Sequence, residues 1–255
     1  MSRNARVAET TLGSHTEDGD VVTDRAPIAV ALDAPDLDTA ARWAALVSPH
    51  VSTLKVGLEL YLRYGAEAVA SVRGGRGVDV FLDLKLHDIP ATVAGAARAV
   101  ARVRPDLLTV HATAGPAAIE AAALALPGTV IVAVTVLTSL TDSDLDQIGL
   151  AGPVREAAVR LAALAVRSGA RGLVCSPHEV AAVRDEVGPD IVLITPGIRP
   201  TGQARYDQAR VGTPEETLRA GADLLVIGRP ITGAADPGAA AAALAMALRR
   251  QAHAS

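Results

Sequence analysis

The strongest constraint on folding is a regular alternation, from Pro27 onward, of short apolar runs with longer segments of helical periodicity. The apolar runs predict eight strands, at Ile28–Leu32, Thr53–Val56, Val78–Leu84, Leu107–His111, Thr129–Leu137, Gly172–Cys175, Ile191–Thr195 and Asp223–Ile227. Each run is followed by a predicted helix, and these helices span Leu37–Val47, Leu58–Val72, Thr92–Val103, Pro116–Leu126, Val154–Val166, His178–Val187, Pro214–Ala220 and Pro237–Leu248.

Strands that alternate with helices pair in parallel, and eight such units over about 230 residues are typical of a single-domain (β/α)8 TIM barrel. We expect this α/β barrel to span residues 26–255 and to be preceded by a polar, flexible extension over residues 1–25. A doubly wound open sheet is the alternative. It is disfavoured because no G-x-G-x-x-G follows the first predicted strand and no G-x-x-x-x-G-K-[ST] occurs.

Composition argues against several functional classes. The chain of 255 residues has a formal charge of −4 and only five aromatic residues, whereas nucleic-acid binding needs a basic face and stacking rings. No apolar run approaches the roughly 18 residues of a membrane helix. Residues 1–25 lack the apolar core of a secretory signal. A lone cysteine, Cys175, cannot form an intrachain disulfide and favours a reducing, cytoplasmic location.

Charged residues near the carboxyl ends of the predicted strands mark a candidate active site, because catalytic groups of (β/α)8 barrels lie there. Side chains alternate along a strand, so Asp83 and Lys85 share the face that points into the barrel, and Lys55 points inward beside them. Asp33 follows the first strand and Asp88 the third. Crowded charges in a partly desolvated place indicate function; the alternative is a buried ion pair that only fixes strand register.

The ends of the last two strands predict a phosphate site, because the loops after strands 7 and 8 form the usual phosphate site of this fold. Gly197, Arg199 and Gly202 follow the seventh strand, and Gly228 and Arg229 follow the eighth. Glycine lets the backbone approach an anion, and the arginine fork matches phosphate oxygens.

One segment carries a family resemblance. Asp83-Leu84-Lys85-Leu86-His87-Asp88-Ile89-Pro90-Ala91-Thr92 resembles the D-x-K-x-x-D-I-P-x-T signature of the orotidine 5′-phosphate decarboxylase family. Other motifs follow in the family's order across most of the chain after Ala26: Ala31-Leu32-Asp33, Leu54-Lys55-Val56-Gly57, Ala133–Ser139, Thr195–Pro200 and Val226–Pro230.

The resemblance implies a (β/α)8 barrel that works as a homodimer without a metal or organic cofactor. The implied reaction removes CO₂ from orotidine 5′-monophosphate to give uridine 5′-monophosphate, the last step of de novo pyrimidine nucleotide synthesis. Lys85 would be the proton donor, and Lys55, Asp83 and Asp88 would complete an alternating charge network around it.

The resemblance also implies substrate contacts. Asp33, Lys55 and Thr92 would bind the ribose hydroxyls, and Asp88, Ile89 and Thr92 would reach into the partner's site. Further nucleotide contacts would come from Asp83, Thr138 and Pro196, and the phosphate end would be held by Arg199, Gln208, Gly228 and Arg229.

Two other functions share part of this sequence pattern. A Mg²⁺-dependent sugar-phosphate barrel, such as hexulose-phosphate synthase or keto-gulonate-phosphate decarboxylase, also carries D-x-K-x-x-D, but it places an acidic ligand where this chain has Lys55. A non-catalytic phosphate-binding barrel would have little use for four alternating charges. The six histidines include no H-x-x-x-H pair, so no metal site is expected, and His87 and His111 are interpreted as structural.

Overall fold

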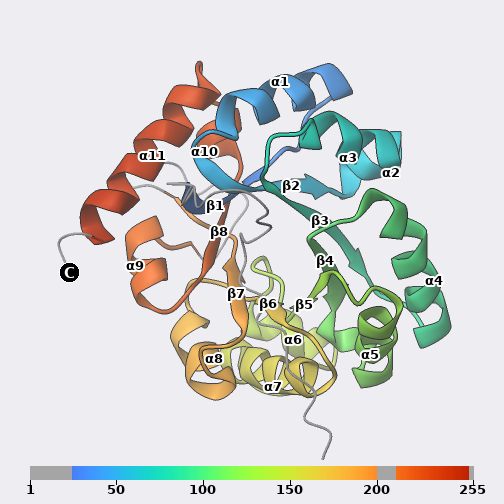
Figure 1. The fold of residues 1–255 in the computed structure, drawn as a ribbon. Helices are drawn as coiled ribbons and strands as arrows, with labels where there is room; N and C mark the ends of the chain where they lie inside the picture. Colours follow the sequence, from blue (N-terminus) through green and yellow to red (C-terminus); the bar gives the residue numbers. More distant parts are fainter. Residues whose placement is uncertain (1–24, 200–210, 253–255) are drawn as a thin grey trace, which may run out of the picture.

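Residues 25–199 and 211–252 are described by the structure, a computed structural model. Eight parallel strands close into a barrel in sequence order, and helices surround it (Figure 1). The strands are β1 (Ala26–Ala31), β2 (Val51–Gly57), β3 (Asp79–Leu86), β4 (Leu107–His111), β5 (Val130–Val134), β6 (Gly172–Val174), β7 (Val192–Thr195) and β8 (Leu224–Ile227). The predicted (β/α)8 barrel is confirmed. The expected N-terminal extension lies, except for Arg25, outside the described residues.

The helices form the outer layer of the barrel. They are α1 (Leu37–Val47), α2 (Leu58–Tyr64), α3 (Ala66–Arg73), α4 (Pro90–Val100), α5 (Pro116–Ala125), α6 (Asp142–Gln147), α7 (Val154–Arg167), α8 (Val180–Val187), α9 (Pro214–Arg219), α10 (Arg229–Thr232) and α11 (Pro237–Ala252). Short 3-10 helices follow α4 at Ala101–Val103 and β4 at Ala112–Ala114.

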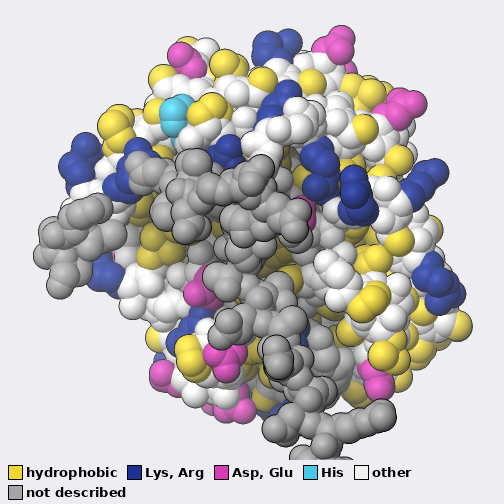
Figure 2. All heavy atoms as spheres, in the orientation of Figure 1, with side chains coloured by type: hydrophobic (Ala, Val, Ile, Leu, Met, Phe, Trp, Pro, Cys, Tyr) yellow, Lys and Arg dark blue, Asp and Glu magenta, His cyan; other side chains and the backbone are white. Residues whose placement is uncertain are grey.

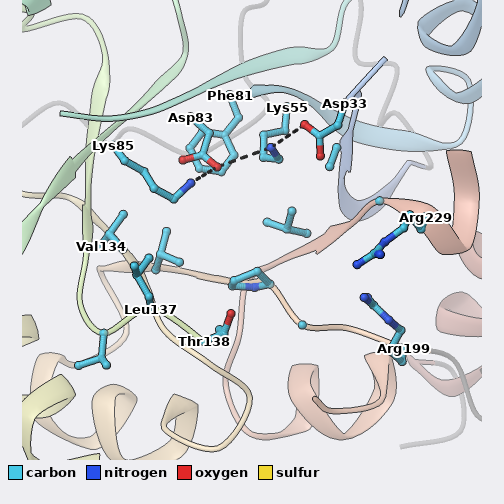
Figure 3. A pocket seen from close by; sticks show the side chains of 17 residues that line it. Asp33, Lys55, Phe81, Asp83, Lys85, Val134, Leu137, Thr138, Arg199 and Arg229 are labelled. Carbon is cyan, nitrogen blue, oxygen red and sulfur yellow. Dashed lines mark hydrogen bonds and ion pairs between the residues drawn. The ribbon is translucent and has the colours of Figure 1, made fainter. Parts of the chain in front are cut away.

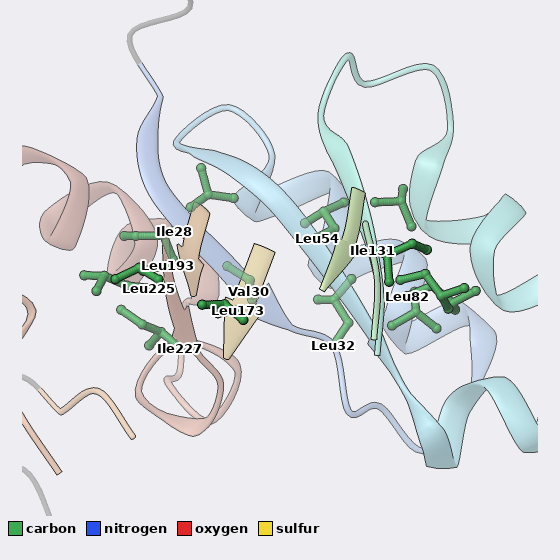
Figure 4. Close-up of a cluster of buried hydrophobic side chains, with 14 of the residues drawn as sticks. Ile28, Val30, Leu32, Leu54, Leu82, Ile131, Leu173, Leu193, Leu225 and Ile227 are labelled. Carbon is green, nitrogen blue, oxygen red and sulfur yellow. The ribbon is translucent and has the colours of Figure 1, made fainter. Parts of the chain in front are cut away.

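Strand side chains alternate between two apolar layers. The larger layer lies between strands and helices, and Figure 4 shows it around Ile28, Val30 and Leu225. The smaller layer fills the barrel interior and comprises Ala29, Phe81, Leu107, Val132, Ile194 and Leu224. This inner layer closes the barrel from below, so polar groups further along the strands lie at the mouth.

The helix predicted over Leu58–Val72 is wrong in one respect, because it is two helices. Gly65 separates α2 from α3 with φ +56° and ψ −131°. A side chain with a Cβ disfavours this conformation, and glycine adopts it freely.

The fifth strand is shorter than predicted, since β5 ends at Val134 rather than at Leu137. Thr135 leaves the strand and donates its hydroxyl to the Val174 carbonyl at 2.8 Å. The following segment contains an unpredicted helix, α6, which the Thr141 side chain caps in a reciprocal pair with Asp144.

Surface charge is mixed. Figure 2 shows acidic and basic side chains of the described residues interspersed around the rim of the face drawn in Figure 1. Within the two described ranges, no helix is both long enough and apolar enough to cross a bilayer.

Candidate active site

A cavity of about 290 Å³ opens at the carboxyl ends of the strands, where the sequence predicted the site. This volume lies close to the lower end of the ~300–1,000 Å³ range of small-molecule pockets. Its charged lining consists of Asp33, Lys55, Asp83, Lys85, Arg199 and Arg229. Four cations against two carboxylates leave a formal excess of two positive charges among these residues, which suits an anionic ligand.

Four of these side chains form a row of alternating charge along one wall of the cavity (Figure 3). Lys85 Nζ lies 2.7 Å from Asp83 Oδ2, and Lys55 Nζ lies 3.6 Å from the same oxygen. Lys55 Nζ also lies 3.5 Å from Asp33 Oδ1. One carboxylate oxygen of Asp83 is therefore shared by two ammonium groups.

The electrostatics of the row favour its charged form. Burial of the Asp83 carboxyl opposes ionisation, but attraction to Lys55 and Lys85, with hydrogen bonds from Lys85 and Thr109, outweighs it. The pKa of Asp83 consequently lies below its usual value of 3.8. The Lys55 side chain is only 9% exposed and that of Lys85 is 31% exposed, so Lys85 is the more accessible of the two ammonium groups that line the cavity.

Gly57 gives the row its close packing. A Cβ at this position would lie 2.8 Å from Asp33 Oδ1 and 3.0 Å from Lys55 Nζ. A side chain at the end of β2 would therefore force the Asp33 carboxylate to shift and would crowd the Lys55 ammonium, so glycine suits this pair. The sequence motif contained Gly57, but this reason for it was not predicted.

The backbone of Lys85 departs from regular strand geometry, so strand alternation alone does not explain how its side chain enters the cavity. Its backbone is left-handed, with φ +48°, and the β3–β4 register is irregular between Leu82 and Leu86. Leu82, Leu84 and Leu86 nevertheless pack on the outer layer, as predicted. Asp83 and Lys85 both line the cavity, so their predicted orientation is also found.

Two arginines lie at the other end of the cavity. Arg199, which is 8% exposed, and Arg229 direct their guanidinium groups toward one another in Figure 3. Gly197, Gly228, Pro196 and Thr138 line the same cavity; these predicted residues meet there.

Three predicted residues do not join this cavity within one chain. Asp88, Ile89 and Thr92 are exposed and are not part of its lining. The Asp88 carboxylate accepts a hydrogen bond from the Ile89 backbone N–H at 2.6 Å. Gln208 and Gly202 lie outside the described residues.

A histidine pair flanks the row. The rings of His87 and His111 lie 5.2 Å apart at the ends of β3 and β4. Burial lowers the pKa of His111 below 6.5, and electrostatic interactions with His87 and Lys85 lower it further, against an opposing attraction to Asp83. The shift disfavours a second cation beside Lys85.

Sequence reasoning missed the apolar walls and one hydrogen-bonding residue. Phe81, Val134, Val174 and Val226 line the cavity, and period-two alternation from Lys55 and Asp83 could have identified Phe81. Thr109 on β4 contacts both Asp83 and Lys85 without lining the cavity. A polar residue within an apolar strand was its only sequence signal.

The cavity wall differs from the donor set that a divalent cation prefers. Carboxylate, carbonyl and water oxygens are the usual ligands of Mg²⁺, whereas the β2 position here carries the Lys55 ammonium. Among the residues that the structure describes, no group of three or more His, Cys, Asp or Glu side chains could hold a metal ion.

Comparisons with known proteins identify the family. The family described as "Orotidine 5'-phosphate decarboxylase / HUMPS family" matches residues 26–244. A protein of Thermobifida fusca named orotidine 5'-phosphate decarboxylase is 68% identical over 225 residues, covering 88% of this chain and 97% of that protein. A protein of the same name from Anaeromyxobacter sp. (strain K) is 57% identical, covering 87% of this chain and 97% of that protein.

Solved structures agree with the sequence comparisons. The crystal structure of orotidine 5'-phosphate decarboxylase from Lactobacillus acidophilus has a TM-score of 0.75 at 34% identity and covers 87% of this chain and 98% of that one. An uncharacterized conserved protein from Geobacillus kaustophilus has a TM-score of 0.74 at 35% identity, covering 87% of this chain and all of that one. The chain belongs to the orotidine 5'-phosphate decarboxylase / HUMPS family.

Proposed function

We propose that this protein is a carboxy-lyase that converts orotidine 5′-monophosphate into uridine 5′-monophosphate and CO₂, with Lys85 as the proton donor. This reaction is the last step of de novo pyrimidine nucleotide synthesis. The observation that carries the proposal is the sharing of Asp83 Oδ2 between two ammonium groups, at 2.7 Å from Lys85 and 3.6 Å from Lys55. The names of the two relatives described above support the same substrate.

Charge orients the substrate along the cavity. Arg199 and Arg229 bind the 5′-phosphate, because a guanidinium fork matches phosphate oxygens. The pyrimidine then lies toward Lys85 at the opposite end. A substrate with a phosphate and a carboxylate complements the excess positive charge of the lining.

The chemical step needs no electron sink in the protein. The bond between the ring carbon and its carboxylate breaks, CO₂ leaves, and the electron pair stays on the ring carbon. The Lys85 ammonium stabilises this charge and transfers a proton to the same carbon, after which solvent reprotonates the amine. Preorganised charge in a site that excludes water is usually the largest catalytic contribution.

The other residues of the site hold the nucleotide. Asp33 and Lys55 bind ribose hydroxyls, and the loops after β5 and β7 contact the nucleotide through Thr138 and Pro196. Gly228 lines the phosphate end, where Gln208 is also expected.

We propose a homodimer in which Asp88, Ile89 and Thr92 complete the partner's site. All three are exposed, which supports this role, and the large apolar side chain of Ile89 is 66% exposed. Leu62 on α2 is a second large apolar side chain in water, at 79% exposed. Large apolar side chains left in water favour an interface.

The single cysteine, Cys175, is buried and free, in keeping with a cytoplasmic location.

The ultraviolet absorbance change of orotidine 5′-monophosphate tests the reaction directly. We expect turnover in excess EDTA by the parent protein and none by Lys85→Ala. A parent protein that leaves the absorbance unchanged, or that converts hexulose phosphates only with Mg²⁺, would refute the proposal.

A further inference from the structure

We propose that Thr109 is a positioning residue, whose hydroxyl holds Asp83 and Lys85 in the arrangement that catalysis needs. The inference rests on the proposed decarboxylation. It concerns a residue that neither lines the cavity nor belongs to the signature segment.

One hydroxyl serves both residues. Thr109 is fully buried on β4, where its Oγ1 donates to Asp83 Oδ1 at 3.0 Å and accepts from the Lys85 backbone N–H at 2.8 Å. A hydroxyl has one proton to donate and two lone pairs, so it can form both bonds at once.

The bond to Asp83 fixes the carboxylate plane. Oδ1 faces Thr109, which leaves Oδ2 for Lys85 and Lys55. Without the hydroxyl, Oδ1 would be a buried acceptor without this donor, and the carboxylate could rotate away from the two ammonium groups.

The bond to Lys85 supports an unfavourable backbone. A left-handed φ of +48° is uncommon for a residue with a Cβ. The regular β3–β4 pairing is interrupted at this point, between Leu82 and Leu86. Thr109 supplies an acceptor for the Lys85 N–H there, and the resulting backbone turn directs the ammonium toward Asp83.

The test replaces the hydroxyl of residue 109 by a methyl group of similar size and measures the effect on catalysis. Thr109→Val removes the hydroxyl, Thr109→Ser retains it, and Thr195→Val is the matched control. Thr195 is also fully buried at a strand end, but its Oγ1 has no hydrogen-bond partner among the described residues.

We expect Thr109→Val to lower kcat roughly tenfold, which corresponds to about 1.4 kcal/mol. KM should change little, because Arg199 and Arg229, which bind the phosphate, are not altered. The acidic limb of its pH profile should move to higher pH, since Asp83 loses a hydrogen bond that favours the carboxylate. Thr109→Ser and Thr195→Val should keep kcat within about threefold of the parent, a change of less than 1 kcal/mol.

The inference would be overturned by a Thr109→Val enzyme with the parent's kcat and pH profile. It would also be overturned by an equal loss of kcat in Thr195→Val. If Thr109→Val does not fold, Thr109→Ala replaces it, and kcat equal to that of Thr109→Ser would also overturn the inference.

A crystal structure separates this inference from the proposed function. In Thr109→Val or Thr109→Ala, Lys85 should leave the left-handed region or lose its contact with Asp83. If the Lys85 backbone stays left-handed and the Lys85–Asp83 contact is unchanged, the positioning role is refuted, even if the parent protein proves inactive on orotidine 5′-monophosphate. An inactive parent would refute the proposed function alone.

Discussion

Asp83→Asn should destabilise the fold as well as stop catalysis. Among the described residues, Asp83 is the only carboxylate within ion-pair distance of Lys85, and its loss leaves two ammonium groups close together. At an effective dielectric constant of about 20, the gross attractions are roughly 6 kcal/mol to Lys85, at 2.7 Å, and about 5 kcal/mol to Lys55, at 3.6 Å. Desolvation offsets much of this, and breaking a buried pair costs ~3–5 kcal/mol. Lys85 is partly exposed, so we expect a loss of about 3 kcal/mol.

Urea unfolding, followed by the fluorescence of the single tryptophan Trp43, measures this loss. For a chain of this size, about 3 kcal/mol corresponds to a decrease in Tm of roughly 6–12 °C. The double variant Asp83→Asn/Lys85→Met relieves the repulsion and should lose less stability than the sum of the single variants. An Asp83→Asn protein as stable as its parent would refute the reasoning.

Three further predictions concern the phosphate end, the partner's residues and pH. Arg229→Ala should lower kcat/KM roughly tenfold to a hundredfold, the loss of one charge-assisted bond to phosphate, at an unchanged Tm; equal kcat/KM would contradict the phosphate role. Mixed Lys85→Ala and Asp88→Ala chains should regain activity, because one site of a heterodimer carries neither defect; no recovery after confirmed subunit exchange would count against shared sites. The pKa of His111 is below 6.5 in the folded protein, so its contribution to stability is present above that pH and is lost as pH falls through the folded value. Denaturation at pH 7.5 and pH 5 should therefore show a smaller pH-dependent loss for His111→Asn than for the parent, and identical losses would refute the assignment.

Hydrophobic periodicity was sufficient to predict the barrel, because each strand–helix unit carries its own local pattern. Element ends were harder to predict. Gly65 interrupts a continuous helical pattern through its backbone conformation, which periodicity does not record. Thr135 is β-branched like the strand before it, yet its hydroxyl bonds to the Val174 carbonyl and the strand ends.

The charged residues of the site could be predicted because Lys55 and Asp83 interrupt strands that are otherwise apolar. The features that hold these charged side chains in place could not be predicted. The left-handed turn at Lys85 and the hydroxyl of Thr109 depend on contact between two strands 24 residues apart in sequence, which a single strand's pattern does not contain. Asp88 and Thr92 remain predictions, because their proposed contacts lie across a dimer.

The position of Lys85 in a complex with a non-reactive analogue of orotidine 5′-monophosphate is the most direct measurement. We expect its Nζ within about 3.2 Å of the ring carbon that bears the carboxylate, with Arg199 and Arg229 on the phosphate. An analogue bound with Lys85 turned toward bulk solvent would contradict the proposal that this ammonium donates the proton.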